Sequence, residues 1–166
     1  MRAKLVCLVV FALLPGACSR STSGTQPPAP LDKSLLPGKW KNSSDSQLVS
    51  GYEFDADGVL RVAIRGMEHP LLGRYSWEGD RDLNLEYQTP PEVQQAYEAA
   101  AKAYKDDVLK QIKDGKLPDR AGPSIIGAVR NSWPEKETVK VAISDKPRLL
   151  ILGSEGGVSQ TFELKE

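Results

Sequence analysis

The chain has 166 residues, and its 22 lysine and arginine side chains are balanced by 22 aspartate and glutamate side chains. This length suits one domain with accessory segments. The balanced charge argues against a nucleic-acid partner, which would leave a basic surface. The hydrophobic content of 40% is too high for a wholly disordered chain.

The start of the chain has the pattern of an export signal. Arg2 and Lys4 precede an apolar run over residues 5–14. That run has the length of a signal-peptide core, roughly 7–15 residues. It is too short to cross a bilayer as a helix, which needs about 20 apolar residues. Small residues then lead into Cys18, and we predict a lipoprotein signal peptide over residues 1–17.

The sequence Leu-Leu-Pro-Gly-Ala-Cys over residues 13–18 resembles the lipobox of bacterial lipoproteins, with Pro15 where leucine normally stands. The resemblance implies that Cys18 is diacylated and becomes the mature N-terminus, which would attach the protein to a membrane. The alternative is a plain secretory signal cut after Ala17, but such a site favours a small residue, not proline, three positions before the cut. Ser19 behind the cysteine permits sorting to the periplasmic side of the outer membrane. The alternative signal would leave a secreted or soluble periplasmic protein.

Cysteine usage limits the chemistry of the mature chain. Cys7 lies inside the leader and would be removed with it, so Cys18 would be the only cysteine left. This excludes an internal disulfide, a catalytic thiol and a cysteine metal site in the folded part. Residues 18–35 are rich in serine, threonine, glycine and proline, and we predict a flexible tether that reaches roughly 20–24 Å.

Two parts of the chain, 38–88 and 136–165, show the alternation of β-strands. Gly38-Lys39-Trp40 opens the first strand, where the glycine allows a tight turn and the tryptophan can plug one end of a barrel. Apolar and polar residues then alternate, with glycine-containing turns between the runs. The pattern predicts one antiparallel sheet system. Its further strands are expected over 47–54, 59–65, 73–77, 82–87, 138–144, 148–152 and 158–164.

The segment between these parts predicts a long amphipathic helix over about 90–114. Thr89 to Glu92 has the spacing of a capping box, Pro90 would take the first helical position, and Gly115 would end the helix. An apolar stripe follows at helical spacing: Val93, Tyr97, Ala100, Tyr104, Val108 and Ile112. We expect the barrel of the same chain to cover this stripe, with a partner protein as the alternative. Residues 125–133 suit either a helix or a strand.

Few residues are candidates for catalysis. His69 is the only histidine, and beside Pro70 it is more often a solvated turn residue than a base or ligand. A zinc site needs three or four ligands of this kind. The carboxylates Glu78, Asp80 and Asp82 stand on a turn and would act as a hydrolytic pair only across a cleft. The acidic turn over 55–58 and the glycine-rich turn over 153–157 fit structural roles better than a calcium loop or a phosphate loop.

One aromatic group is a candidate ligand site. Most of its members stand at inward positions of the expected strands. Core packing explains them more simply than a ligand cavity, and both interpretations stay open. The group consists of Trp40, Tyr52, Phe54, Tyr75, Trp77 and Phe162.

These motifs resemble the lipocalin-like domains of small bacterial envelope lipoproteins. The matching parts are Gly38-Lys39-Trp40, the hairpin from Tyr52 to Gly58, the strand 73–77 and the hairpin 139–162. The resemblance implies an up-and-down barrel without a general activity. We predict a mainly β, β-rich α+β domain over 36–166. It would be a small antiparallel lipocalin-like barrel or curled sheet with an inserted long amphipathic helix.

Two functions follow as expectations. The first is a lipid-anchored, non-catalytic binding module of the cell envelope, without cofactor, metal or nucleic acid, that holds a small apolar ligand or an envelope protein. The second is a periplasmic hydrolase that uses His69 or a carboxylate pair. The absence of a complete nucleophile–base set in the sequence favours the binding module.

Overall fold

The computed structural model of the protein describes residues 30–44, 47–154 and 159–165. The predicted signal peptide, Cys18 and most of the predicted tether lie outside the described residues. So does the turn expected at 155–157. In the part of the chain that is described, no helix combines the length and the apolarity needed to cross a membrane.

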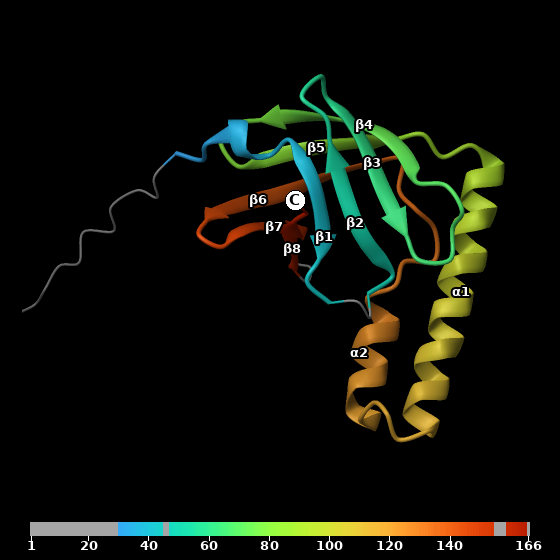
Figure 1. The fold of residues 1–166 in the computed structure, drawn as a ribbon. Helices are drawn as coiled ribbons and strands as arrows, with labels where there is room; N and C mark the ends of the chain where they lie inside the picture. The colour runs from blue at the N-terminus through green and yellow to red at the C-terminus, as the bar shows by residue number, and fades with distance from the viewer. Residues whose placement is uncertain (1–29, 45–46, 155–158, 166) are drawn as a thin grey trace, which may run out of the picture.

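Eight strands form a closed antiparallel barrel, in which each strand pairs with the next and the last pairs with the first (Figure 1). This confirms a mainly β fold and one antiparallel sheet system over 38–88 and 136–165. The strands are β1 (Gly38–Asn42), β2 (Val49–Phe54), β3 (Val59–Ile64), β4 (Leu71–Glu78), β5 (Asp82–Tyr87), β6 (Lys136–Asp145), β7 (Arg148–Ser154) and β8 (Gln160–Leu164).

The core fills the barrel with the apolar residues of alternate strand positions. Leu60, Val62 and Ile64 of β3 are buried, whereas Arg61 and Ala63 between them face outward. The register pairs Leu83 of β5 with Val139 of β6, both inside. The period of two in the sequence therefore corresponds directly to the two faces of the barrel wall.

One irregularity changes the inward set of β2. The pairing with β3 shifts between Val49 and Gly51, so that both Val49 and Tyr52 are buried. Gly51 has no side chain where β1 passes, and a Cβ there would lie 2.5 Å from the carbonyl oxygen of Trp40. The bulge and the close approach of the two strands depend on this glycine.

One end of the barrel is closed by the segment before β1. Residues 33–35, which the composition assigns to the tether, form the 3-10 turn η1 (Lys33–Leu35). The Trp40 indole N–H donates to the Leu36 carbonyl at 2.8 Å, and both side chains are buried. Arg148 donates to the Leu35 carbonyl at 3.2 Å, and its guanidinium carbon lies 6.0 Å from the Trp40 ring centroid. Trp40 therefore plugs the closed end, as its position at the start of the first strand predicts.

The helix between β5 and β6 is α1 (Pro91–Lys113). The predicted capping box is wrong: Pro90 is the N-cap, with an extended ψ of 160°, and no side chain caps the helix. A residue before proline is pushed out of the helical region, so Pro91 sets the helix start. At the other end Gly115 has a φ of 70°, and Lys116 N–H donates to the Gln111 carbonyl at 2.8 Å. This is the glycine-dependent helix stop that the sequence indicates.

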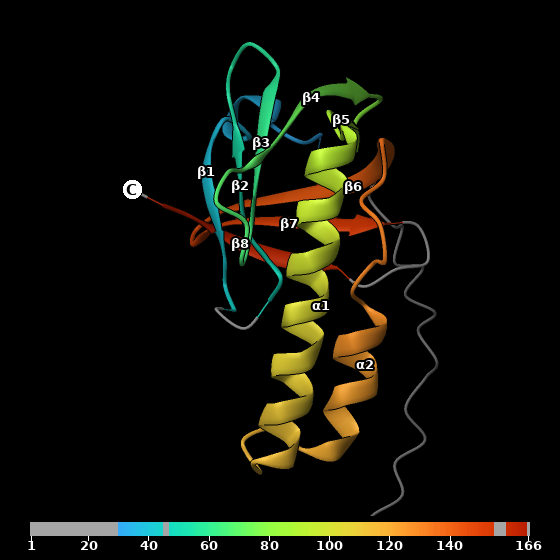
Figure 2. The same cartoon turned by 90° about the vertical axis from the view of Figure 1, so that its right-hand side faces the viewer.

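Helix α1 packs against the barrel of its own chain. Figure 2 shows it crossing the barrel and continuing past it. Ala100 lies next to Gly66 of the β3–β4 loop, where a Cβ would come within 3.6 Å of the alanine. The buried side chains of α1 belong to the same hydrophobic cluster as the barrel core: Tyr97, Ala100, Ala101, Tyr104 and Val108. This face is therefore covered within the same chain, by the barrel core together with Trp133 and the short helix Gly122–Gly127.

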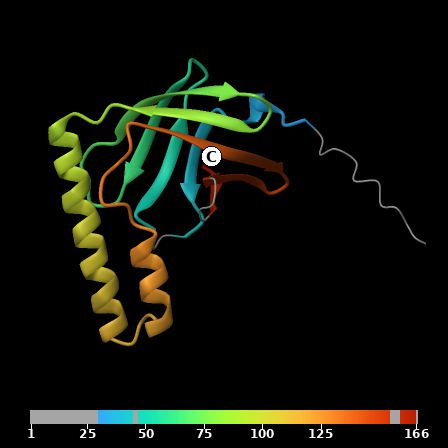
Figure 3. The same cartoon turned by 180° about the vertical axis from the view of Figure 1, so that it is seen from behind.

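The segment 116–135 folds back along α1 as a second, shorter arm. It contains η2 (Asp119–Ala121) and α2 (Gly122–Gly127), and residues 128–135 contain no strand. A Cβ at Gly122 would meet the end of the Ile112 side chain, so the two helices pack closely at this point. Figure 3 shows the two helices on one side of the barrel and the segment before β1 on the opposite side. The helices therefore belong to the end of the barrel opposite the Trp40 plug.

Candidate functional site

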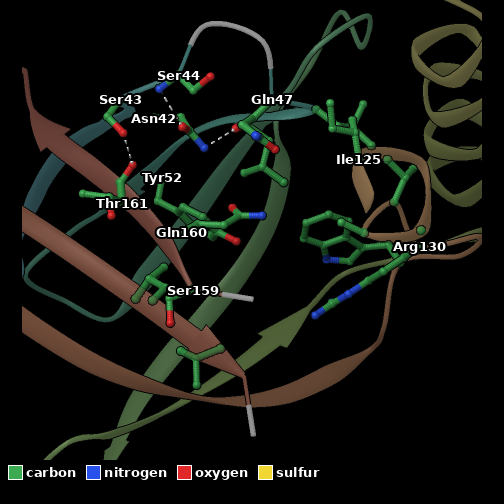
Figure 4. Close-up of a pocket in the computed structure, with 18 of the residues that line it drawn as sticks. Asn42, Ser43, Ser44, Gln47, Tyr52, Ile125, Arg130, Ser159, Gln160 and Thr161 are labelled. Carbon is green, nitrogen blue, oxygen red and sulfur yellow. Dashed lines mark hydrogen bonds between the residues drawn. The ribbon is translucent and has the colours of Figure 1, made fainter. Parts of the chain in front are cut away.

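A cavity of about 620 Å³ lies at the helix end of the barrel (Figure 4). Its wall combines strand ends with α2 and the segment before β6. Both polar and apolar side chains contribute. The lining residues are Asn42, Ser43, Ser44, Gln47, Leu48, Val49, Tyr52, Tyr97, Ser124, Ile125, Gly127, Ala128, Val129, Arg130, Trp133, Glu137, Val139, Leu152, Ser159, Gln160 and Thr161.

Uncharged polar groups gather on one side of the cavity, where β1 ends beside β8. Asn42 is the one buried polar residue among those described. It donates to the Val49 carbonyl at 3.1 Å and accepts from Ser44 N–H at 2.9 Å. Ser43 donates through its hydroxyl to the Thr161 carbonyl at 3.0 Å. These bonds fix the rim of the cavity, because both ends of the Asn42 amide are engaged with backbone.

A charged pair lies on the other side. Glu137 is opposite Leu85 and shares the inward parity of Val139, so its carboxylate enters the barrel, and only 14% of its side chain is exposed. Tyr87 donates to Glu137 Oε1 at 2.8 Å, and Arg130 Nη2 donates to Oε2. Both carboxylate oxygens are thus engaged, which is how a buried charge is stabilised.

Burial and the charged pair set the ionisation of the neighbouring hydroxyls. Burial raises the pKa of Tyr52 above its usual value, and the nearby Glu137 charge adds to the effect. Burial also raises the pKa of Tyr87, with further contributions from Tyr52 and Glu137. Burial works against the charge of Arg130, but the hydrogen bond with Glu137 raises its pKa overall. At neutral pH the site therefore holds neutral tyrosines and one balanced ion pair.

An aromatic wall connects this pair with α1. The Trp133 ring meets Tyr87 and Tyr97 edge-to-face, with centroids 5.3 and 5.2 Å apart. The Arg130 guanidinium carbon lies 5.7 Å from the Trp133 centroid. The Trp133 side chain is 6% exposed, and its indole N–H has no hydrogen-bond partner among the described residues. The wall therefore contains a donor that the protein leaves unused.

The six aromatic residues singled out in the sequence lie in three parts of the barrel. Tyr52 lines the cavity. Phe54 and Phe162 are fully buried beneath it, and Tyr75 packs edge-to-face on Phe54 at 5.1 Å. The two tryptophans lie toward the closed end: Trp40 is its plug, and Trp77 is half-buried under the Lys33 ammonium at 5.1 Å. The aromatic group mostly fills the barrel, and one member reaches the open space.

Sequence reasoning missed the charged pair and the aromatic wall. The alternation Val139, Val141, Ile143 extends back to Glu137 and places a carboxylate inside, which is a visible signal. Trp133 stands at helical spacing with Ile125 and Val129, but α2 ends at Gly127, so this spacing does not predict where the ring lies. Arg130 carries no comparable signal. The positions of both residues depend on how α2 folds back toward the barrel.

The two kinds of candidate for hydrolysis, His69 and the carboxylates, lie apart. His69 is exposed in the β3–β4 loop and borders a separate groove of about 350 Å³ on the outer wall. Glu78 lies at the other end of β4, and Asp82 across from it pairs with Lys140. Asp55 stabilises its own turn by pairing with Arg61. Among the described residues no cluster of histidine, cysteine and carboxylates could hold a metal ion.

Comparison with known proteins places no relative beside this chain. No family model, no curated protein and no solved structure matches it.

Proposed function

We propose that the protein is a non-catalytic binding module that holds a small amphipathic molecule in the cavity at the helix end of its barrel. One observation carries the proposal: a barrel filled at one end by Leu36 and Trp40 encloses about 620 Å³ at the other. Ligand sites in proteins are concave, measure roughly 300–1,000 Å³ and occur at the mouths of barrels.

The lining supports an amphipathic ligand over a purely apolar one. Tyr52, Val139 and Leu152 form an apolar floor. Above it, hydroxyl and amide groups line one side, and Figure 4 shows Ser159 and Gln160 there, across from Ile125 and Arg130. Arg130 and Glu137 balance each other, so the cavity as a whole has no net charge from its lining. A ligand with an apolar body and a few polar groups satisfies both sides.

The proposal also covers the type of barrel and the attachment of the protein to a membrane. We infer that the module is lipocalin-like, with Gly38-Lys39-Trp40 opening a closed up-and-down barrel. We also infer that the leader ends at a lipidated Cys18, which attaches the domain to the periplasmic side of a cell-envelope membrane. The leader pattern of residues 1–18 supports this part.

Fluorescence titration with the uncharged dye N-phenyl-1-naphthylamine tests the binding function. The dye should bind the parent with one site and become strongly fluorescent. Gln160→Trp fills the cavity, because Gln160 shares the inward parity of Phe162. The variant should weaken dye binding by about tenfold or more, because the added ring occupies space that the dye needs.

Ile151→Trp is the matched control, because Ile151 pairs with Thr161 and is exposed on the outer wall. It should bind the dye like the parent. Equal binding by both tryptophan variants would reject the cavity as the site. Binding lost on changing His69 would move the function to the outer groove.

A further inference from the structure

The helix side of the cavity combines an engaged carboxylate with hydrogen-bond donors that no described residue uses. Its one carboxylate, Glu137, already accepts from Tyr87 at one oxygen and from Arg130 at the other. The Trp133 indole N–H is buried and has no partner among the described residues. A donor left unsatisfied in a buried wall costs stability unless a ligand or water completes it.

Arg130 adds further donors to this wall. A guanidinium carries five N–H groups, and among the described residues the Arg130 side chain donates only to Glu137. Its side chain is 42% exposed, against 14% for Glu137. Figure 4 shows it extending from the right toward the middle of the cavity. Both members of the pair line the cavity, and the positive member is the more accessible of the two.

We propose that Arg130 and Trp133 form an anion subsite, so that the cavity selects amphipathic molecules with one acceptor-rich anionic group such as a carboxylate or sulfonate. This inference rests on the proposed binding function. The ligand's anionic group would take the unused guanidinium donors, and its apolar body would lie against Ile125 and Tyr97. Glu137 acts as a positioning residue that holds Arg130 and moderates its charge.

The test compares two dyes with the same aromatic body. The sulfonate 8-anilinonaphthalene-1-sulfonate carries the anionic group, and N-phenyl-1-naphthylamine lacks it. The measured quantity is the ratio of their dissociation constants. Arg130→Gln should weaken sulfonate binding on the order of tenfold, as expected for loss of a charge-assisted hydrogen bond, and change the neutral dye less than about twofold.

Two variants show whether sulfonate binding depends on the charge of Arg130 or on how its side chain packs. Glu137→Gln leaves the Arg130 charge uncompensated, so it should bind the sulfonate more tightly than the parent. The double variant Arg130→Gln with Glu137→Gln is neutral and should still lose the sulfonate preference. Glu137→Gln and the double variant still test the subsite if Arg130→Gln alone is unstable. Circular dichroism checks that each variant is folded. Arg120→Gln, at an exposed arginine of the same insertion, is the control.

The outcomes are distinct. A dye ratio unchanged in the double variant, or sulfonate binding that does not improve in Glu137→Gln, overturns the anion subsite and leaves the cavity function standing. A parent that binds neither dye overturns both. A preference for the sulfonate dye that is lost in Arg130→Gln and kept in Arg120→Gln establishes the subsite.

Discussion

Tyr97 is the point at which α1 is attached to the cavity wall, and its removal tests that attachment. The side chain is 1% exposed, its ring meets Trp133 edge-to-face at 5.2 Å, and its hydroxyl donates to the Arg130 carbonyl at 3.2 Å. Tyr97→Ala should cost about 3–5 kcal/mol, the range of large aromatic truncations in cores. Typical domains have only about 5–15 kcal/mol of stability, so the loss is large.

The structure divides this loss into parts. Tyr97→Phe removes only the hydrogen bond and should cost about 0.5–1.5 kcal/mol. The edge-to-face contact adds about 0.5–1.5 kcal/mol beyond the buried area, and the remainder is apolar burial and the cavity left behind. Urea denaturation followed by circular dichroism measures each free energy of unfolding.

Leu109→Ala is the control on the same helix, because Leu109 is 53% exposed. Its effect should stay within about 0.5 kcal/mol. If Tyr97→Ala proved no more destabilising than Leu109→Ala, the helix would not be part of the core. Loss of a co-purifying protein from a Tyr97→Ala variant of normal stability would instead identify α1 as a partner surface.

Three further predictions concern the closed end, the buried tyrosines and the anchor. Arg148→Ala should destabilise the domain by about 1–3 kcal/mol in urea denaturation, because Trp40 loses its cationic cover and a backbone carbonyl loses a donor. Stability should fall as the pH rises above about 10, since unfolded tyrosines ionise there while Tyr52 and Tyr87 stay neutral in the fold. Absorbance at alkaline pH checks this, and ionisation of more than three of the five tyrosines before unfolding would refute it. Cys18→Ala should release the protein from membranes in cell fractionation, and unchanged membrane association would refute lipidation.

Most of the barrel was predictable from alternation in the sequence. Period-two segments such as 59–65 and 82–87 bury one face, and a one-residue slip would expose that face to water, so pattern and structure agree closely. The helix expected over 90–114 spans Pro91–Lys113, because its apolar stripe and Gly115 are local signals. Closure of β1 on β8 depends on contacts between the two ends of the domain, which no local pattern reports.

The site was predictable only in part. The inward position of Glu137 can be recognised in the sequence, because Glu137 is a charged residue in an alternating series whose other members are apolar and buried. Tyr52 shares the parity of Phe54, so its inward position was predictable, whereas the β2 bulge that turns Val49 inward depends on the close approach of β1 to Gly51, which no pattern within β2 reveals. Arg130 and Trp133 reach the cavity through the return of α2 alongside α1, where Gly122 packs against the Ile112 side chain. Such packing is tertiary and has no periodicity in the chain.

The three tryptophans allow the central claim to be tested directly, because each reports a different place. Trp133 lies in the cavity wall, Trp40 donates to Leu36 at the closed end, and Trp77 lies under Lys33. Their indole N–H signals in a two-dimensional ¹H–¹⁵N NMR spectrum can be assigned with single Trp→Phe variants. Titration with N-phenyl-1-naphthylamine should shift the Trp133 signal and leave those of Trp40 and Trp77 in place. A shift confined to Trp40 or Trp77, or no shift when the dye is bound, would contradict a ligand site at the helix end of the barrel.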